Sequence, residues 1–174
     1  TSLRQFLGYT DSMERYCQST VRHLVAPVMF RFMYCCGLRP CEARNLDRAD
    51  VNFENGRVFI KESKHYRERY VYAPDSLMPI IGEYLKNIDC VFPDRQPLFL
   101  DRNGIRFSYG AQQYLFEHCR DHSGIKASGT RQPNLYSFRH SFATHRIYRW
   151  FKGGKDLGAY LPKLSAYMGH SHYE

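Results

Sequence analysis

The sequence contains none of the patterns that mark a membrane or secreted protein. Its longest apolar run, from Leu24 to Met33, is interrupted by Pro27 and Arg31 and is too short to cross a bilayer. Its first residues also lack the charged and then apolar pattern of a secretory signal. We therefore expect a cytoplasmic protein with no membrane partner.

Signatures of several kinds of site are missing as well. The six cysteines form no C-x-x-C pair, so we expect them to be buried, reduced thiols. No G-x-S-x-G elbow of a serine hydrolase occurs. His118 and His122 have a spacing suited to a metal ion on a helix, but HCRDH lacks the glutamate of H-E-x-x-H. A metal-dependent phosphoesterase is therefore only our third hypothesis, and we expect neither a metal nor a cofactor.

Acidic residues are in the minority. Lys and Arg number 25 against 17 Asp and Glu, which gives a formal net charge of +8. Such an excess favours a polyanionic partner such as nucleic acid or an anionic membrane surface, although a merely soluble basic protein is the alternative on charge alone. A chain of 174 residues that is 43% hydrophobic can bury one good core, so we predict a single domain over residues 1–174.

Hydrophobic spacing predicts mostly helices. Apolar residues recur at intervals of three and four over residues 24–36, and Gly37 is expected to end this helix. A short helix then begins near Arg39, with Pro40 in its first turn. Further helices are predicted over 76–85, over 109–122 with Ser108 as N-cap, over 137–150 with Ser137 as N-cap, and over 161–168 ending at Gly169.

A change of pattern between these helices predicts a small sheet. Residues 51–53 and 57–60 flank Asn55-Gly56, which is a favoured hairpin turn, and residues 69–72 alternate as a third strand. The expected fold is α+β: a mainly helical domain with a small antiparallel three-stranded sheet.

Cations concentrate first around Arg39 and then around Arg139. Arg39 and Glu42 stand three apart, so the carboxylate can orient the guanidinium, although an ordinary surface ion pair would show the same spacing. Arg139 falls in the first turn of its helix, where free N–H groups already favour an anion, or it is simply an exposed arginine.

The hairpin tip carries a third group of cations. Lys64 can act there as a proton donor or point charge beside a phosphodiester, while His65, Arg67 and Arg69 are candidates for contact with neighbouring DNA phosphates. A charged turn that discourages edge pairing is the competing interpretation.

The order of these segments resembles the catalytic domain of the tyrosine recombinases, the phage-integrase type of site-specific recombinase. The segments that carry the resemblance are GLRPCEARNL, the hairpin with Lys64, LYSFRHSFATH and LPKLSAYMGHSH. It implies that Arg39 and Arg139 clamp the scissile phosphate, that Lys64 protonates the leaving 5′ oxygen, and that His170 helps to hold the phosphate. It also implies recombination or integration of double-stranded DNA through a covalent 3′-phosphotyrosyl intermediate, by a tetramer on DNA.

Two positions depart from the family's pattern. Tyr136 stands where the family commonly has histidine or lysine, and a phenol can donate a hydrogen bond to a phosphate but brings no charge. His65 stands where glycine is usual. Tyr136 therefore keeps its catalytic position only as a hydrogen-bond donor, and a non-catalytic basic DNA-binding module of the same fold is the alternative.

Neither tyrosine near the Gly-His pair stands where the family has its nucleophile, which follows the histidine at a greater distance than the four residues left after His170. Tyr167 has the helical spacing of a core or half-buried aromatic, and Tyr173 also does not stand at the nucleophile's place. We therefore expect the nucleophile beyond Glu174, an N-terminal DNA-clamping domain upstream, and a fragment that is inactive in cleavage.

Overall fold

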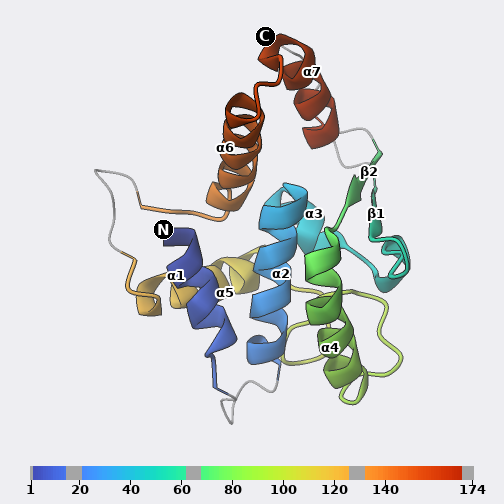
Figure 1. Ribbon diagram of the computed structural model, residues 1–174. Coiled ribbons are helices and arrows are strands. Elements are labelled where there is room, and N and C mark those ends of the chain that lie inside the picture. Colours follow the sequence, from blue (N-terminus) through green and yellow to red (C-terminus); the bar gives the residue numbers. More distant parts are fainter. Residues whose placement is uncertain (1, 15–20, 62–67, 126–131, 170–174) are drawn as a thin grey trace.

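A computed structural model of the chain describes residues 2–14, 21–61, 68–125 and 132–169 (Figure 1). Two strands and a set of helices make up the described residues. The elements are α1 (Ser2–Asp11), α2 (Arg22–Cys36), α3 (Pro40–Asn45), η1 (Arg48–Asp50), β1 (Arg57–Ile60), β2 (Arg69–Tyr72), η2 (Asp75–Leu77), α4 (Met78–Asp89), α5 (Tyr109–His122), α6 (Ser137–Lys152) and α7 (Leu157–Met168).

Helix α2 lies at the centre of the core. It contacts α1, α3, α4 and α6, and because it has neighbours on several sides its apolar residues are buried around most of its circumference. The fully buried side chains include Phe30, Phe32, Met29 and Met33. The helix ends at Gly37, which has a φ of +65°, as the sequence predicted.

The sheet has two strands where the sequence predicted three. β1 and β2 pair antiparallel, with Val58 opposite Val71. In the segment predicted as the first strand, Val51 forms only an isolated bridge to Val58. The side chain of Asn52 then accepts hydrogen bonds from the backbone N–H groups of Glu54 and Asn55. These bonds turn the chain before a ladder can extend. The prediction of a third strand is not confirmed.

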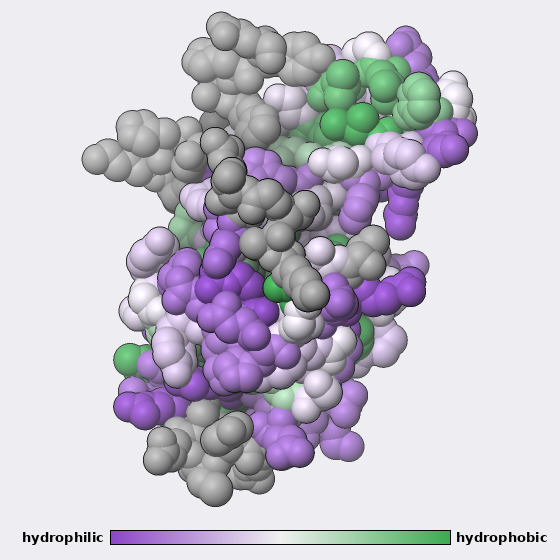
Figure 2. Space-filling model, turned by 90° about the vertical axis from the view of Figure 1, so that its left-hand side faces the viewer, coloured by the Kyte–Doolittle hydropathy of each residue, from purple (hydrophilic) through white to green (hydrophobic). Residues whose placement is uncertain are grey.

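Helices α6 and α7 stand above the part of the molecule that α1 to α5 form (Figure 1). They pack on each other through a second apolar cluster of Phe142, Leu164 and Met168. Apolar side chains gather at the height of these two helices, whereas the facing surface below is mostly hydrophilic (Figure 2). None of the helices within the described ranges is long and apolar enough to cross a membrane.

The helix boundaries follow local hydrogen bonding. Ser108 caps α5 by accepting the backbone N–H of Ala111 at 3.1 Å, as predicted. Ser137 is wrong as an N-cap, because it is the first residue of α6 and its hydroxyl accepts instead from the backbone N–H of Asn134 at 3.0 Å. Helix α7 begins at Leu157, earlier than predicted, after Asp156 caps it.

Gly37 is expected to resist substitution. A Cβ there would lie 2.5 Å from Cδ1 of Phe142, and its positive φ strains any other residue. Gly37→Ala should lower the free energy of unfolding by about 2 kcal/mol or more, from backbone strain and overpacking together. Urea denaturation measures this change.

Gly82 in α4 supplies the matched control, since a Cβ there meets nothing within 4 Å. Gly82→Ala should raise the free energy of unfolding by up to about 1 kcal/mol through helix propensity. Equal effects of the two substitutions would contradict the packing described here.

Candidate functional site

The carboxylate of Glu42 lies at the centre of a cluster of arginines. Glu42 is the third residue of α3, and its Oε2 accepts the backbone N–H of Arg39 at 2.8 Å, which caps the helix. Its Oε1 accepts from Nη1 of Arg39 and from Nη1 of Arg69, both at 2.8 Å, and Nη2 of Arg69 lies 2.9 Å from Oε2. Nη1 of Arg139 is 3.9 Å from Oε2. Three guanidiniums therefore surround one buried carboxylate.

The same three arginines bind the end of α7. The contacts are Arg69 Nε to Tyr167 O at 2.8 Å, Arg139 Nη2 to Met168 O, and Arg39 Nη2 to Gly169 O at 2.9 Å. Carbonyls at a helix C-terminus have no partner within the helix and carry partial negative charge, so cations stabilise them. Gly169 closes the helix with a φ of +68°, directly before position 170.

Arg139 joins two further elements to the cluster. It lies in the first turn of α6, and its Nη1 donates to the carbonyl of Gly37 at 2.7 Å, at the end of α2. Its side chain is 6% exposed. The site thus forms where α2, α3, β2, α6 and α7 meet. Within the described ranges its ion pairs join three positive charges to one negative charge.

The arginines decide the ionisation of Glu42. Burial by itself raises the pKa of this carboxyl, but hydrogen bonds and charge from Arg69, together with hydrogen bonds from Arg39, outweigh burial and lower the pKa below its ordinary value. Glu42 is therefore ionised at neutral pH and contributes to stability in that form.

The structure brings together part of the predicted site. Arg39, Glu42 and Arg139 meet as described above. Arg69, predicted to touch DNA, has its guanidinium paired with Glu42, with the side chain 9% exposed. Tyr136 precedes α6 and is half exposed. Four predicted residues lie outside the described ranges, and their roles stay predictions: Lys64, His65, Arg67 and His170.

Tyr167 is a half-buried aromatic packed against the core, as its spacing predicted. Its ring stacks on Phe142, with 5.7 Å between centroids, and its hydroxyl accepts from the backbone N–H of Tyr72 at 3.4 Å. Burial raises the pKa of Tyr167 to about 12. A phenol that is packed against Phe142 and resists ionisation is poorly placed to attack a phosphate.

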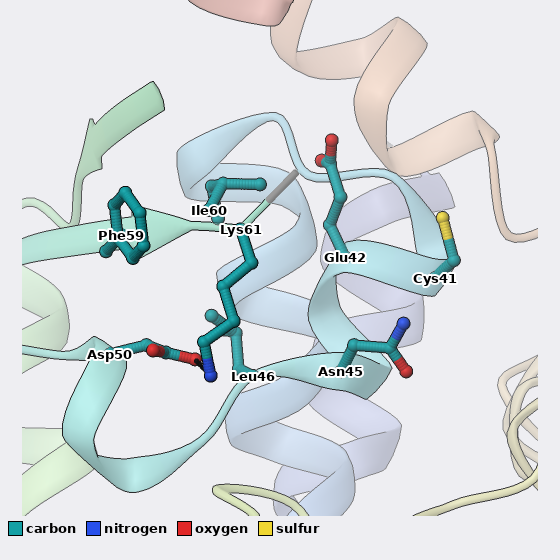
Figure 3. A pocket seen from close by; sticks show the side chains of 8 residues that line it. All are labelled: Cys41, Glu42, Asn45, Leu46, Asp50, Phe59, Ile60 and Lys61. Carbon is teal, nitrogen blue, oxygen red and sulfur yellow. Dashed lines mark ion pairs between the residues drawn. The ribbon is translucent and has the colours of Figure 1, made fainter. Parts of the chain in front are cut away.

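Lys61 is a charged residue near the site that no sequence pattern had indicated. With Glu42 and Cys41 it lines a cavity of about 190 Å³. Its ammonium lies 2.6 Å from Asp47 and 3.0 Å from Asp50, and Figure 3 shows it pointing away from the Glu42 carboxylate. Hydrogen bonding to Asp47, followed by that to Asp50, raises the pKa of Lys61. The spacing of Lys61 from Asp47 and Asp50 gave no signal, because Lys61 meets these two acids only when β1 packs on η1.

The histidine pair gives the metal hypothesis no support. His118 Nε2 lies 3.2 Å from the hydroxyl of Tyr9, and Cys119 is buried with its Sγ against Met13. No group of three or more His, Cys, Asp or Glu in the part of the chain that the structure describes could hold a metal ion.

The arrangement of helices matches solved recombinases. It superposes on XerA recombinase with a TM-score of 0.76 at 18% identity, covering 98% of this chain and 53% of that one. The lambda integrase catalytic core gives a TM-score of 0.62 at 16% identity, covering 98% of this chain and 90% of the other. The fold is therefore that of a tyrosine recombinase catalytic domain.

Sequence comparison gives the family itself. Residues 8–174 match the phage integrase family model, and the chain belongs to this family. It is 32% identical over 162 residues to a putative integrase/recombinase, y4rB, of Sinorhizobium fredii, covering 91% of this chain and 52% of that protein. It is 30% identical over 148 residues to tyrosine recombinase XerA of Thermococcus onnurineus, with coverages of 83% and 46%. The chain thus spans about half the length of the curated relatives it matches.

Glu42→Gln is expected to destabilise the fold strongly. The amide removes the one negative charge among three guanidiniums, and breaking a buried ion pair costs about 3 kcal/mol or more. The pKa of Glu42 is lowered in the folded state. The variant's loss of free energy of unfolding should therefore be complete above the unfolded pKa of about 4.3, and it should shrink as pH falls through the folded pKa. Urea denaturation at several pH values tests both parts.

Asp11→Asn serves as the control. It breaks the surface ion pair between Asp11, whose side chain is 52% exposed, and Arg31. It should cost less than about 1 kcal/mol. The assignment of Glu42 as the central charge would be contradicted by equal losses in the two variants.

Proposed function

We propose that this chain is the phosphate-activating part of the catalytic domain of a site-specific DNA recombinase or integrase. The observation that carries the proposal is the convergence of Arg39 and Arg139, from separate helical segments, on Glu42 and on the turn before His170. Two guanidiniums fixed in this way are suited to bind the non-bridging oxygens of one phosphodiester.

The proposed reaction is a transesterification. A tyrosine oxygen attacks the scissile phosphorus and forms a 3′-phosphotyrosyl bond as the bond from phosphorus to the 5′ oxygen breaks. Lys64 gives a proton to that leaving oxygen, and His170 supports the phosphate. In the transition state negative charge develops on the non-bridging oxygens, and in this proposal these oxygens face Arg39 and Arg139. Donors that are already fixed at such atoms lower the barrier most. The covalent bond preserves the energy needed for rejoining, so no nucleotide cofactor is required.

The partner that the proposal assigns is double-stranded DNA, bound by a tetramer. The net charge of +8 supports a polyanionic partner. A solved structure with the same fold, at a TM-score of 0.73, is XerH site-specific recombinase bound to its difH substrate. In this proposal the attacking tyrosine belongs to a part of the protein outside residues 1–174, because Tyr167 is packed against the α6–α7 cluster and Tyr173 stands nearer to His170 than the family's nucleophile does.

Tyr136 favours the alternative of a non-catalytic DNA-binding module with this fold. It stands at the residue before α6, where the family has a charged side chain, and it supplies only a phenol. Tyr136 is half exposed, so its hydroxyl can still donate a hydrogen bond to a phosphate oxygen. The catalytic proposal assigns it only this role.

The first test is covalent trapping with the full-length protein. The substrate is a nicked duplex made from DNA that flanks the reading frame. After cleavage the short strand that carries the free 5′ hydroxyl dissociates at the nick, so rejoining is blocked and a protein-DNA adduct should remain. Arg139→Lys should form at least about 100-fold less adduct, because lysine lacks the fork that binds two phosphate oxygens.

Adduct formation should be unaffected by a chelator, and a chelator-sensitive cleavage would favour the metal-dependent phosphoesterase instead. Binding to the same duplex without any adduct, across all flanking sites, would favour the non-catalytic module.

The second test concerns residues 1–174 alone. This segment should bind duplex DNA without forming an adduct, with affinity falling steeply between about 50 and 200 mM salt as counterions are released. Fluorescence anisotropy measures the dependence. Salt-independent affinity, or an adduct formed by this segment, would be inconsistent with the proposal.

A further inference from the structure

Arg69 has a partner in the structure that differs from the one its place on the hairpin suggested. Both terminal nitrogens of its guanidinium bind the two oxygens of Glu42, at 2.8 and 2.9 Å. This bidentate contact fixes the plane of the carboxylate as well as its position. The orientation of Glu42 is therefore set from β2, a different element from the helix that carries it.

The same side chain supports the turn at the end of α7. Nε of Arg69 donates to the carbonyl of Tyr167 at 2.8 Å. A Cβ at Gly169 would lie 3.1 Å from Nη1 and 3.2 Å from Cζ of Arg69, so the guanidinium fills the space directly beside this glycine. Arg69 is also the first residue of β2, the strand that follows residues 62–67.

We propose that Arg69 is a positioning residue for strand cleavage that does not itself bind DNA. It orients Glu42, and through Glu42 the guanidinium of Arg39, and it holds the turn at Gly169 that leads to His170. The inference rests on the proposed function and assigns a role within the same site.

Geometry explains why cleavage should be sensitive to this residue. Oε1 of Glu42 accepts from Arg69 and from Arg39 at the same 2.8 Å, so rotating the carboxylate away from Arg69 also moves the atom that holds Arg39. Nη2 of Arg39 is in turn fixed on Gly169 O. Misplacement of a catalytic group by about 1 Å can cost on the order of 100-fold in rate.

The experiment compares Arg69→Gln with the unchanged full-length protein. Single-turnover cleavage of the nicked duplex should slow by about 10- to 100-fold. DNA affinity and its salt dependence should stay unchanged, whereas loss of a phosphate contact would reduce the slope of log affinity against log salt by about 0.9. In the Glu42→Gln background the further loss caused by Arg69→Gln should be much smaller, because the two act as a pair.

Arg48→Gln is the matched control, since it removes one arginine from a partly exposed ion pair with Asp89, away from the cluster. It should leave the cleavage rate unchanged. If Arg69→Gln fails to fold, Arg69→Lys takes its place: it keeps a cation beside Glu42, loses the fork, and should still cleave at least about 10-fold more slowly.

Cleavage at the unchanged rate in the folded Arg69 variant, or a salt slope reduced by about 0.9, would overturn the inference while leaving the proposed function intact. Absence of any adduct with the unchanged protein would refute the proposed function, and the inference with it.

Discussion

The carboxylate of Glu42 accepts hydrogen bonds from two guanidiniums and lies 3.9 Å from a third, and the elements of the site are held together through it. A buried charge without partners would cost several kcal/mol, and so would each buried arginine if the carboxylate were removed. The group is stable only as a whole. The positions of α3, β2 and α6 are consequently linked at one point, although they belong to distant parts of the chain.

Helix α7 completes the charge balance of this group. Three guanidiniums exceed one carboxylate in charge, and the carbonyls of Tyr167, Met168 and Gly169 supply partial negative charge where it is needed. This contact also places the end of α7, as far as Gly169, against the two arginines proposed to bind phosphate. The remaining excess of positive charge suits the site to an anion.

Most boundaries of the elements could be predicted because their causes are local. Gly37 and Gly169 end helices through a positive φ, Pro40 starts one, and Ser108 caps another by a hydrogen bond within a few residues. The pattern of residues 51–53 wrongly predicted a third strand, because it does not show that the side chain of Asn52 turns the chain before a ladder can extend.

The sequence by itself determined α2 to α7, the strands β1 and β2, and the order of the basic segments by which the family can be recognised, but it did not predict α1. Only the tertiary structure decided the ion pairs between different elements. Spacing placed Glu42 beside Arg39, but it gave no indication that Arg69 would bind the same carboxylate, or that Lys61 would bind Asp47 and Asp50. The physical reason is that spacing defines the faces of one element, whereas an ion pair between elements depends on how their buried surfaces pack.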